Sequence, residues 1–315
     1  MISWQTKAAI QNLLSVTPGG RSINRLLQLA MTKRLVLTDK RFNVKVRQCK
    51  DHLRLTKEKG GNLKNDFVAF ELGTGWHPIV PIGLWLCGAE KVYSVDINSL
   101  VGDRQVRETI EYFLKYINSK KIKEILPQSL SDRISKFTQI IEDYKKKPHR
   151  ELLRGFDIET YVEDAQFFNH NDKKIDFFVS NCVLEHIDRE TLLNIFNNFK
   201  TISSKYCIMS HLIDLSDHYA DFDGSIGAFN FLKFSTDEWK KYNNSFHYHN
   251  RLRVSDYREI YKEAGFAIAG EENVSGARDD LNVVLADDFS SYSMEDLLVK
   301  RSRLIGIYEC THPSS

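Results

Sequence analysis

The clearest chemical signal in the 315-residue sequence comes from two glycines and one aspartate. An apolar run ends in the turn ELGTGWHP, in which Gly73 and Gly75 allow a tight bend and Pro78 suits the first position of a helix. The next apolar segment ends in Asp96, 23 residues after Gly73. Because a carboxylate at this place can accept both hydroxyls of a ribose, the pattern predicts a nucleoside site.

The turn differs from two common nucleotide-binding motifs. A dinucleotide site normally has a third glycine where the helix meets the strand, whereas this chain has Trp76-His77-Pro78. No Lys-Ser or Lys-Thr pair follows the glycines to make a phosphate-binding loop. We therefore expect a nucleoside that carries no pyrophosphate.

Histidines and aspartates gather in two later segments. The first, MSHLIDLSDH at 209–218, closes a predicted strand, and the second, FHYHNRLR at 246–253, precedes a predicted helix. A neutral imidazole is well suited to remove a proton from a hydroxyl group. We take His218 and His211 as the candidate catalytic bases, with Asp214 or Asp217 to orient the ring.

Five further polar residues are expected to line the substrate site: His186, Asn230, His247, His249 and Arg251. His247 and His249 would face opposite ways on a strand, so at most one of them should point into the site. The other three have structural alternatives. His186 could cap a helix, Arg251 could form a surface ion pair, and Asn230 could belong to an ordinary aromatic core.

A metal site is the competing interpretation of His211, Asp214 and His218, because mixed imidazole and carboxylate ligands suit a divalent ion. This signal is the weaker of the two, and we expect no metal. Five cysteines are scattered without CxxC spacing, so neither a zinc site nor disulfides are predicted.

An alternating series of strands and helices positions these residues. Apolar residues at helical spacing predict an N-terminal helical extension or lid over 1–62, and the remainder, 63–315, predicts one domain with a helical insert at about 101–155. Strands are expected near 67–72, 91–95, 156–162, 175–180 and 206–212, from 266, and at 304–309. This order indicates an α/β fold with a mainly parallel seven-stranded sheet, helices on both faces, and ligands at the carboxyl ends of the strands.

Composition limits the class of protein. The chain is 42% apolar and 27% charged, as in globular proteins, and its apolar runs are too short to span a bilayer. Without a signal-peptide pattern at the N-terminus, we expect a cytoplasmic protein that is not in a membrane. Residues 1–60 hold 13 Lys and Arg against three Asp and Glu, which indicates either an anionic partner or, as we favour, ordinary amphipathic helices. Nothing indicates the oligomeric state.

Four segments together resemble the ordered motifs of class I S-adenosylmethionine-dependent methyltransferases, which have a Rossmann-like fold. They are ELGTGWHP, Asp96, the pair Asp164-Ala165, and IDFFVSNCVLEHI at 175–187. The resemblance covers roughly residues 66–310. Two features depart from the family pattern: His77 stands where many members have another glycine, and a helical insert lengthens the path from Asp96 to Asp164.

The resemblance implies S-adenosylmethionine as cofactor. The implied contacts are Glu71, Gly73, Gly75, Asn181 and Cys182 at the methionine part, Asp96 at the ribose, and Ile97, Asp164 and Ala165 at the adenine.

The leading hypothesis for function is methylation of an oxygen in a small molecule or a saccharide. A second hypothesis makes RNA or another nucleic acid the acceptor, bound by the basic residues of 1–60 and of the insert. Against it, the segment Ser180-Asn181-Cys182-Val183 lacks the Asn-Pro-Pro-aromatic and Pro-Cys sequences typical of base methylation. The third hypothesis is a non-enzymatic module that only binds the cofactor.

Overall fold

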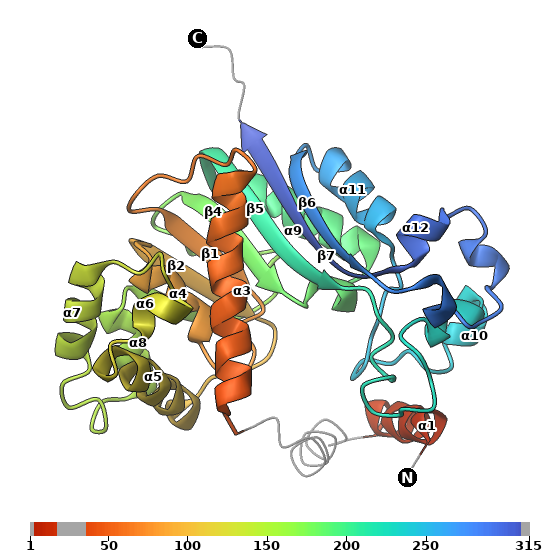
Figure 1. The fold of residues 1–315 in the computed structure, drawn as a ribbon, viewed down its shortest axis with the longest axis horizontal. Coiled ribbons are helices and arrows are strands. Elements are labelled where there is room, and N and C mark those ends of the chain that lie inside the picture. Colours follow the sequence, from red (N-terminus) through yellow and green to blue (C-terminus); the bar gives the residue numbers. More distant parts are fainter. Residues whose placement is uncertain (1–2, 18–35, 310–315) are drawn as a thin grey trace.

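The computed structural model describes residues 3–17 and 36–309, and a seven-stranded sheet lies at its centre (Figure 1). The strands are β1 (Val68–Leu72), β2 (Lys91–Asp96), β3 (Ile158–Val162), β4 (Ile175–Asn181), β5 (Ser203–Asp214), β6 (Ala267–Ser275) and β7 (Val299–Glu309). Their order is β3-β2-β1-β4-β5-β7-β6. β1 to β5 are parallel, while β7 runs antiparallel to both of its neighbours. The predicted α/β class and mainly parallel sheet are confirmed.

Helices cover both faces of this sheet, and further helices lie beside it. Their bounds are α1 (Trp4–Ser15), α3 (Asp39–Glu58), α4 (Ile79–Leu86), α5 (Asp103–Asn118), α6 (Ile122–Ile125), α7 (Ser131–Ile140), α8 (His149–Gly155), α9 (Arg189–Ile202), α10 (Thr236–Trp239), α11 (Val254–Glu263) and α12 (Met294–Leu297). One apolar core joins the sheet to α3, α4 and the α5–α8 group, and a second joins it to α9 and α11. Alternate strand residues divide between the two cores: Ala69 faces the first, whereas Phe70 faces the second.

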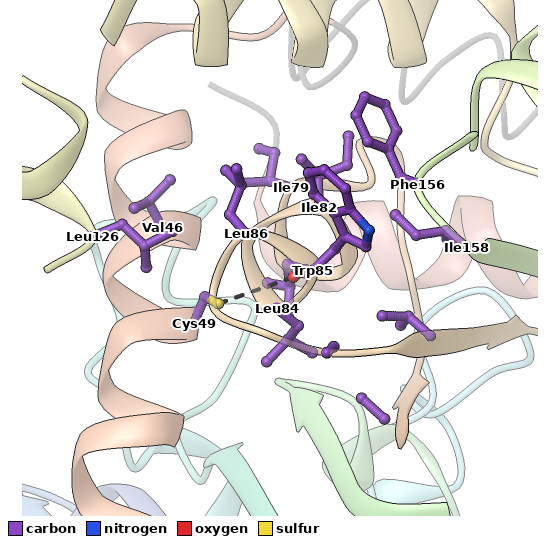
Figure 2. Close-up of a cluster of buried hydrophobic side chains, with 14 of the residues drawn as sticks. Val46, Cys49, Ile79, Ile82, Leu84, Trp85, Leu86, Leu126, Phe156 and Ile158 are labelled. Atoms are coloured by element: carbon purple, nitrogen blue, oxygen red, sulfur yellow. Dashed lines mark hydrogen bonds between the residues drawn. The ribbon is translucent and has the colours of Figure 1, made fainter. Parts of the chain in front are cut away.

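α4 is the centre of the first core, because every residue in it is buried (Figure 2). The Trp85 ring packs edge-on against Phe156, with ring centroids 5.0 Å apart. On the opposite side, Cys49 of α3 approaches α4, and its Sγ lies 3.9 Å from the Val80 carbonyl oxygen. α4 thereby holds the glycine turn, which immediately precedes it, rigidly against the sheet.

The N-terminal helices lie in two different places. α3 packs on α4 and β5, and is therefore part of the layer that covers one sheet face. α1 packs instead in a third apolar cluster, in which Trp4 contacts Tyr219 and Tyr242 from the segment after β5. The helical spacing expected over 18–35 lies outside the described residues. A lid role for the segment 1–62 and for the insert stays a prediction.

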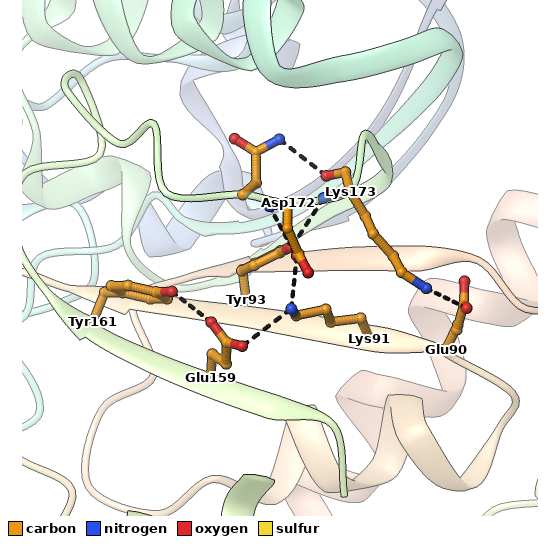
Figure 3. A network of polar contacts seen from close by, with 8 residues as sticks. Glu90, Lys91, Tyr93, Glu159, Tyr161, Asp172 and Lys173 are labelled. Carbon is orange, nitrogen blue, oxygen red and sulfur yellow. Dashed lines mark hydrogen bonds and ion pairs between the residues drawn. The ribbon is translucent and has the colours of Figure 1, made fainter.

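Charged side chains join β2, β3 and the chain before β4 at the amino-terminal edge of the sheet (Figure 3). The Lys91 ammonium lies 3.0 Å from a Glu159 oxygen and 2.6 Å from an Asp172 oxygen, and the Tyr93 hydroxyl donates to the same Asp172 oxygen. A surface pocket of about 490 Å³ lies here, but its lining charges largely pair with one another. It is at the opposite edge from the strand ends expected to bind ligands.

None of the helices in 3–17 and 36–309 is both long and apolar enough to cross a bilayer.

Candidate functional site

The turn between β1 and α4 depends on its two glycines. Gly73 and Gly75 have φ angles of 78° and 68°, in the left-handed region that residues with a Cβ rarely adopt. A Cβ on Gly73 would lie 2.4 Å from a methyl carbon of Val183, because the loop after β4 closes over this glycine. A Cβ on Gly75 would meet no atom of the described chain within 4 Å. The Gly75 side of the turn is therefore open.

Asp96 connects this turn to the end of β2. Its Oδ2 accepts a hydrogen bond from the Gly75 N–H at 3.0 Å, and its Oδ1 accepts one from the Asn98 N–H at 2.8 Å. Burial raises the pKa of Asp96, while the two N–H groups act in the opposite direction. A carboxylate has about four lone-pair sites, so two hydroxyl groups can still donate to it.

Large apolar side chains are exposed at the same edge. Ile97 is 74% exposed, Val162 56% and Phe167 74%. Ile97 directly follows Asp96, and Val162 is the partner of Asp96 in the parallel register of β2 and β3. Exposed apolar residues at strand ends commonly mark a binding surface. Ile97, Val162 and Phe167, which lie at or just after the ends of β2 and β3, are called the apolar edge below.

The loop after β3 brings Asp164 to this region despite the long helical insert. The exposed Asp164 carboxylate accepts hydrogen bonds from the backbone N–H and the side-chain amide of Gln166, at 2.9 and 3.0 Å. Ala165 is buried, and its carbonyl accepts from the Asn198 amide of α9 at 2.9 Å. α9 thus fixes the position of a loop that the sequence could place only by resemblance.

Glu71 is the buried carboxyl group of the site. Its Oε2 accepts from the Ser94 hydroxyl at 2.9 Å, and Ser94 also contacts the Thr74 hydroxyl at 2.5 Å. Burial raises the pKa of Glu71 to about 8, although the Ser94 hydrogen bond and the nearby Lys45 oppose this shift. Glu71 is therefore mostly protonated at neutral pH when nothing cationic is bound.

The raised pKa of Glu71 predicts a pH-dependent stability. Between about pH 4.5 and pH 8 the unfolded chain loses this proton and the folded chain keeps it, so the free energy of unfolding should fall as pH rises. Each pKa unit corresponds to about 1.4 kcal/mol. Urea unfolding at pH 5.5 and pH 8 should show Glu71→Gln gaining stability relative to the wild type as pH rises. A difference between the two proteins that does not change with pH would contradict this account.

The end of β4 is held from α3 by a residue that the sequence analysis did not identify. His52 is fully buried, and its ring nitrogens lie 2.7 Å from the Ser210 hydroxyl and 3.1 Å from the Asn181 side-chain oxygen. Burial lowers the pKa of His52, so the ring is neutral. The next residue, Cys182, has a φ of 57°, a conformation that is rare for a residue with a side chain. Such backbone strain is concentrated at functional sites.

Lys45 is a second residue of α3 that the sequence analysis missed. Its ammonium lowers the pKa of Glu71, Cys182 and Glu185, so it lies near the ends of both β1 and β4. A basic residue on an amphipathic helix carries no sequence signal that separates this position from solvent-exposed ones.

Four histidines come together beyond the ends of β4 and β5. The His218 ring centroid lies 5.0 Å from that of His186, 4.8 Å from that of His249 and 6.1 Å from that of His247. The His218 Nε2 is 3.9 Å from an Asp214 oxygen, and the His186 Nδ1 donates to the Tyr248 carbonyl at 2.7 Å. The structure therefore brings together His218, Asp214 and three of the expected substrate-site residues. The expectation that His247 and His249 face opposite ways is wrong, because the segment that carries them is not a strand and both rings contact His218.

His211 does not belong to this histidine cluster. It is fully buried on the other side of β5, where its ring stacks on Phe196 and its Nδ1 lies 2.7 Å from the Ser180 hydroxyl. Burial lowers the pKa of His211 to about 3. A ring with no access to a ligand cannot take a proton from one, so His211 is not retained as a catalytic base.

Asn230 and Arg251 are also structural in this arrangement. The Asn230 amide donates to the buried Asp217 at 2.9 Å. Arg251 donates to the carbonyls of Phe231 and Phe234 at 3.1 and 2.5 Å, and its guanidinium lies between two aromatic rings. Neither side chain is placed to bind a substrate, because its donors already satisfy buried acceptors.

No protein-family model and no curated protein sequence matches the chain. It resembles solved structures of methyltransferases at low sequence identity. Magnesium protoporphyrin IX methyltransferase from Synechocystis, with S-adenosylhomocysteine bound, is 14% identical, with a TM-score of 0.44 over 95% of this chain and 100% of that chain. An S-adenosylmethionine-dependent methyltransferase from Clostridium acetobutylicum is 11% identical, with a TM-score of 0.45 over 91% and 99%. One from Methanosarcina mazei is 13% identical, with a TM-score of 0.43 over 78% and 94%.

The sheet itself identifies the fold. A dinucleotide-binding sheet has the order 3-2-1-4-5-6, whereas here the antiparallel β7 lies between β5 and β6. The fold is a Rossmann-like α/β fold in which the antiparallel β7 is inserted between β5 and β6. The parallel strands β1 to β5 present the glycine turn, Asp96, Asn181 and Asp214 at one edge of this sheet.

Proposed function

We propose that the protein is an S-adenosylmethionine-dependent methyltransferase whose cofactor lies across the carboxyl ends of β1, β2 and β4. One observation carries this proposal: the Gly75 N–H donates to Asp96 beside the apolar edge. This contact sets a carboxylate next to an open turn and an apolar surface. A ribose with an attached adenine needs these two features together.

Charged groups on both sides of the glycine turn suit the methionine part of the cofactor. Glu71 would pair with the α-ammonium group, and Lys45 would pair with the α-carboxylate. Asn181, held by His52, would lie beside the methionine chain together with the strained Cys182. The close contact of Val183 with Gly73 brings the loop after β4 down onto this part of the site.

The adenine would lie on the apolar edge. Ile97 would contact one face of the base, and the Asp164 carboxylate would accept a hydrogen bond from its amino group, beside the fixed Ala165. The exposed Phe167 is an additional candidate for this contact, and it lies only two residues beyond Ala165.

Replacement of Asp96 tests the cofactor site. Asp96→Ala should weaken S-adenosylhomocysteine binding by about 2 kcal/mol, or roughly 30-fold, because two hydrogen bonds to a charged group are lost. Isothermal calorimetry on the folded variant measures this change. Asp132→Ala, which removes an exposed aspartate of α7, is the matched control and should bind as the wild type does. Equal affinities of the two variants would remove Asp96 from the site.

We further propose that the acceptor is a hydroxyl group of a small molecule or a saccharide. Methyl transfer from a sulfonium is a displacement that requires alignment and, for a hydroxyl, removal of its proton. The histidine cluster supports this proposal, because it follows the same strand ends as Asn181 and Cys182 and contains His218 beside Asp214. His218 would accept the proton, while His186, His247 and His249 would surround the acceptor.

A further inference from the structure

The carboxyl group of Glu185 is fully buried, and burial raises its pKa although nearby backbone groups and Lys45 oppose this shift. Glu185 lies in a short 3-10 helix (Leu184–His186) after β4 and is 0% exposed. Neither of its carboxylate oxygens has a hydrogen-bond partner in the described chain. An unpaired buried carboxyl group costs several kcal/mol when ionised, so proteins normally pair it or use it to bind a cation. A buried, unpaired group at a strand end requires a functional explanation.

Two imidazoles share the space that Glu185 faces. One ligand atom from each of Glu185, His186 and His218 lies within 4.8 Å of the other two. Because the His186 Nδ1 donates to the Tyr248 carbonyl, its Nε2 carries the lone pair. Such a backbone contact on the second ring nitrogen is typical of metal-binding histidines, since it fixes the tautomer and the ring orientation.

A third imidazole lies beside these groups. His249 is 3% exposed, and its Nε2 has no hydrogen-bond partner in the described chain. Its ring centroid is 4.8 Å from that of His218. This buried nitrogen therefore lies beside the His218 ring with no partner among the described residues.

We propose that Glu185, His186 and His218 bind one divalent transition-metal ion at the carboxyl ends of β4 and β5, with His249 as a fourth ligand. Ligand atoms that share one tetrahedral ion lie about 3.4 Å apart, because each is about 2.1 Å from it. The three groups, which lie within 4.8 Å of one another, therefore need to approach by about 1 Å or more through side-chain rotation. Two or three imidazole nitrogens with one carboxylate oxygen favour Zn²⁺, Fe²⁺ or Mn²⁺ over Mg²⁺, which prefers oxygen ligands.

The ion would take part in the proposed methyl transfer, and this part of the inference rests on that proposed function. An acceptor hydroxyl bound to the ion would lose its proton more readily than a free one, because the cation stabilises the alkoxide. His218 would then hold the ion instead of removing the proton itself. The acceptor would belong to a class that can coordinate a metal, such as a hydroxyl beside a second oxygen in a sugar or a phenol.

Metal binding can be measured without a methyl acceptor. The untagged full chain would be treated with a chelator, dialysed, and titrated with ZnCl₂ and separately with MgCl₂ by calorimetry. We expect one Zn²⁺ per chain, undisturbed by excess Mg²⁺. Glu185→Gln and His218→Gln should each weaken Zn²⁺ binding at least about tenfold. His149→Gln should leave Zn²⁺ binding unchanged, because this histidine of α8 pairs with Asp103 of α5 instead.

Binding of S-adenosylhomocysteine by the same variants shows that they are folded and separates the two proposals. Retained cofactor binding with no Zn²⁺ binding by the wild type would overturn the metal site but not the cofactor site. Zn²⁺ binding that is equally strong in Glu185→Gln and His218→Gln would also overturn the metal site. If Zn²⁺ binds and S-adenosylhomocysteine does not, the metal site stands and the methyltransferase proposal fails. His218→Gln serves alone if Glu185→Gln does not fold, since the His218 side chain is partly exposed whereas Glu185 is fully buried.

Discussion

His218→Gln should lower methyl transfer by roughly 10²- to 10⁴-fold, which is the usual contribution of a group that activates the acceptor. His218 lies at the centre of the histidine cluster, 3.9 Å from Asp214, and Gln can neither accept the proton nor hold an ion as imidazole does. The measurement is the transfer of tritium from methyl-labelled S-adenosylmethionine into the small-molecule and saccharide fraction of a cell extract. This fraction serves as a pool of acceptors.

His149→Gln is the matched control for this prediction and should transfer label as the wild type does. The affinity for S-adenosylhomocysteine should stay within about twofold in both variants, because neither residue is at the cofactor. Unchanged label transfer by His218→Gln would contradict the role of the histidine cluster and leave the cofactor site untouched. The size of the loss is the same whether His218 takes the proton or holds a metal, and the Zn²⁺ titration distinguishes these roles.

The second large effect is expected on stability. Arg253→Met should lower the free energy of unfolding by about 3 kcal/mol or more. The Arg253 side chain is fully buried, and its guanidinium donates to the carbonyls of Leu215, Leu297 and Val299 at 2.9, 3.2 and 2.5 Å. It thereby connects the segments after β5, at the end of α12 and at the start of β7. Methionine fills much of the volume but leaves three buried carbonyls without a donor.

Arg258→Met on α11, the helix that directly follows Arg253, is the control for the loss of an arginine. The Arg258 guanidinium makes two hydrogen bonds with Glu271, but this pair is on the surface, where ion pairs contribute about 1 kcal/mol or less. Urea unfolding of the two variants gives the comparison. Similar losses in both would show that Arg253 does not hold these segments together.

Much of the fold could be predicted because its signals are local. Buried parallel strands are short apolar runs, and β1, β2 and β4 each match such a run closely. β7 was expected only from residue 304, whereas it begins at Val299. Its first part contains the polar residues Lys300, Arg301, Ser302 and Arg303, which give no apolar signal although Arg301 pairs with both Asp214 and Val274.

The candidate site was harder to predict, because several of its determinants depend on contacts between distant segments. His211 and His218 are equally plausible as bases in the sequence, but His211 lies within β5 and faces α9, whereas His218 lies beyond the strand. His52 and Lys45 reach the site from a helix more than a hundred residues before Asn181. Arg251 resembles a substrate ligand in sequence, yet its partners are backbone carbonyls, which no residue pattern reveals.

The central claim is that S-adenosylmethionine binds at the glycine turn and Asp96. Calorimetric titration of the full chain with S-adenosylhomocysteine and, in parallel, with NAD tests it most directly. The structure predicts one S-adenosylhomocysteine per chain and no binding of NAD, because Trp76-His77-Pro78 stands where a pyrophosphate would need a glycine. Binding of NAD with no binding of S-adenosylhomocysteine would contradict the account.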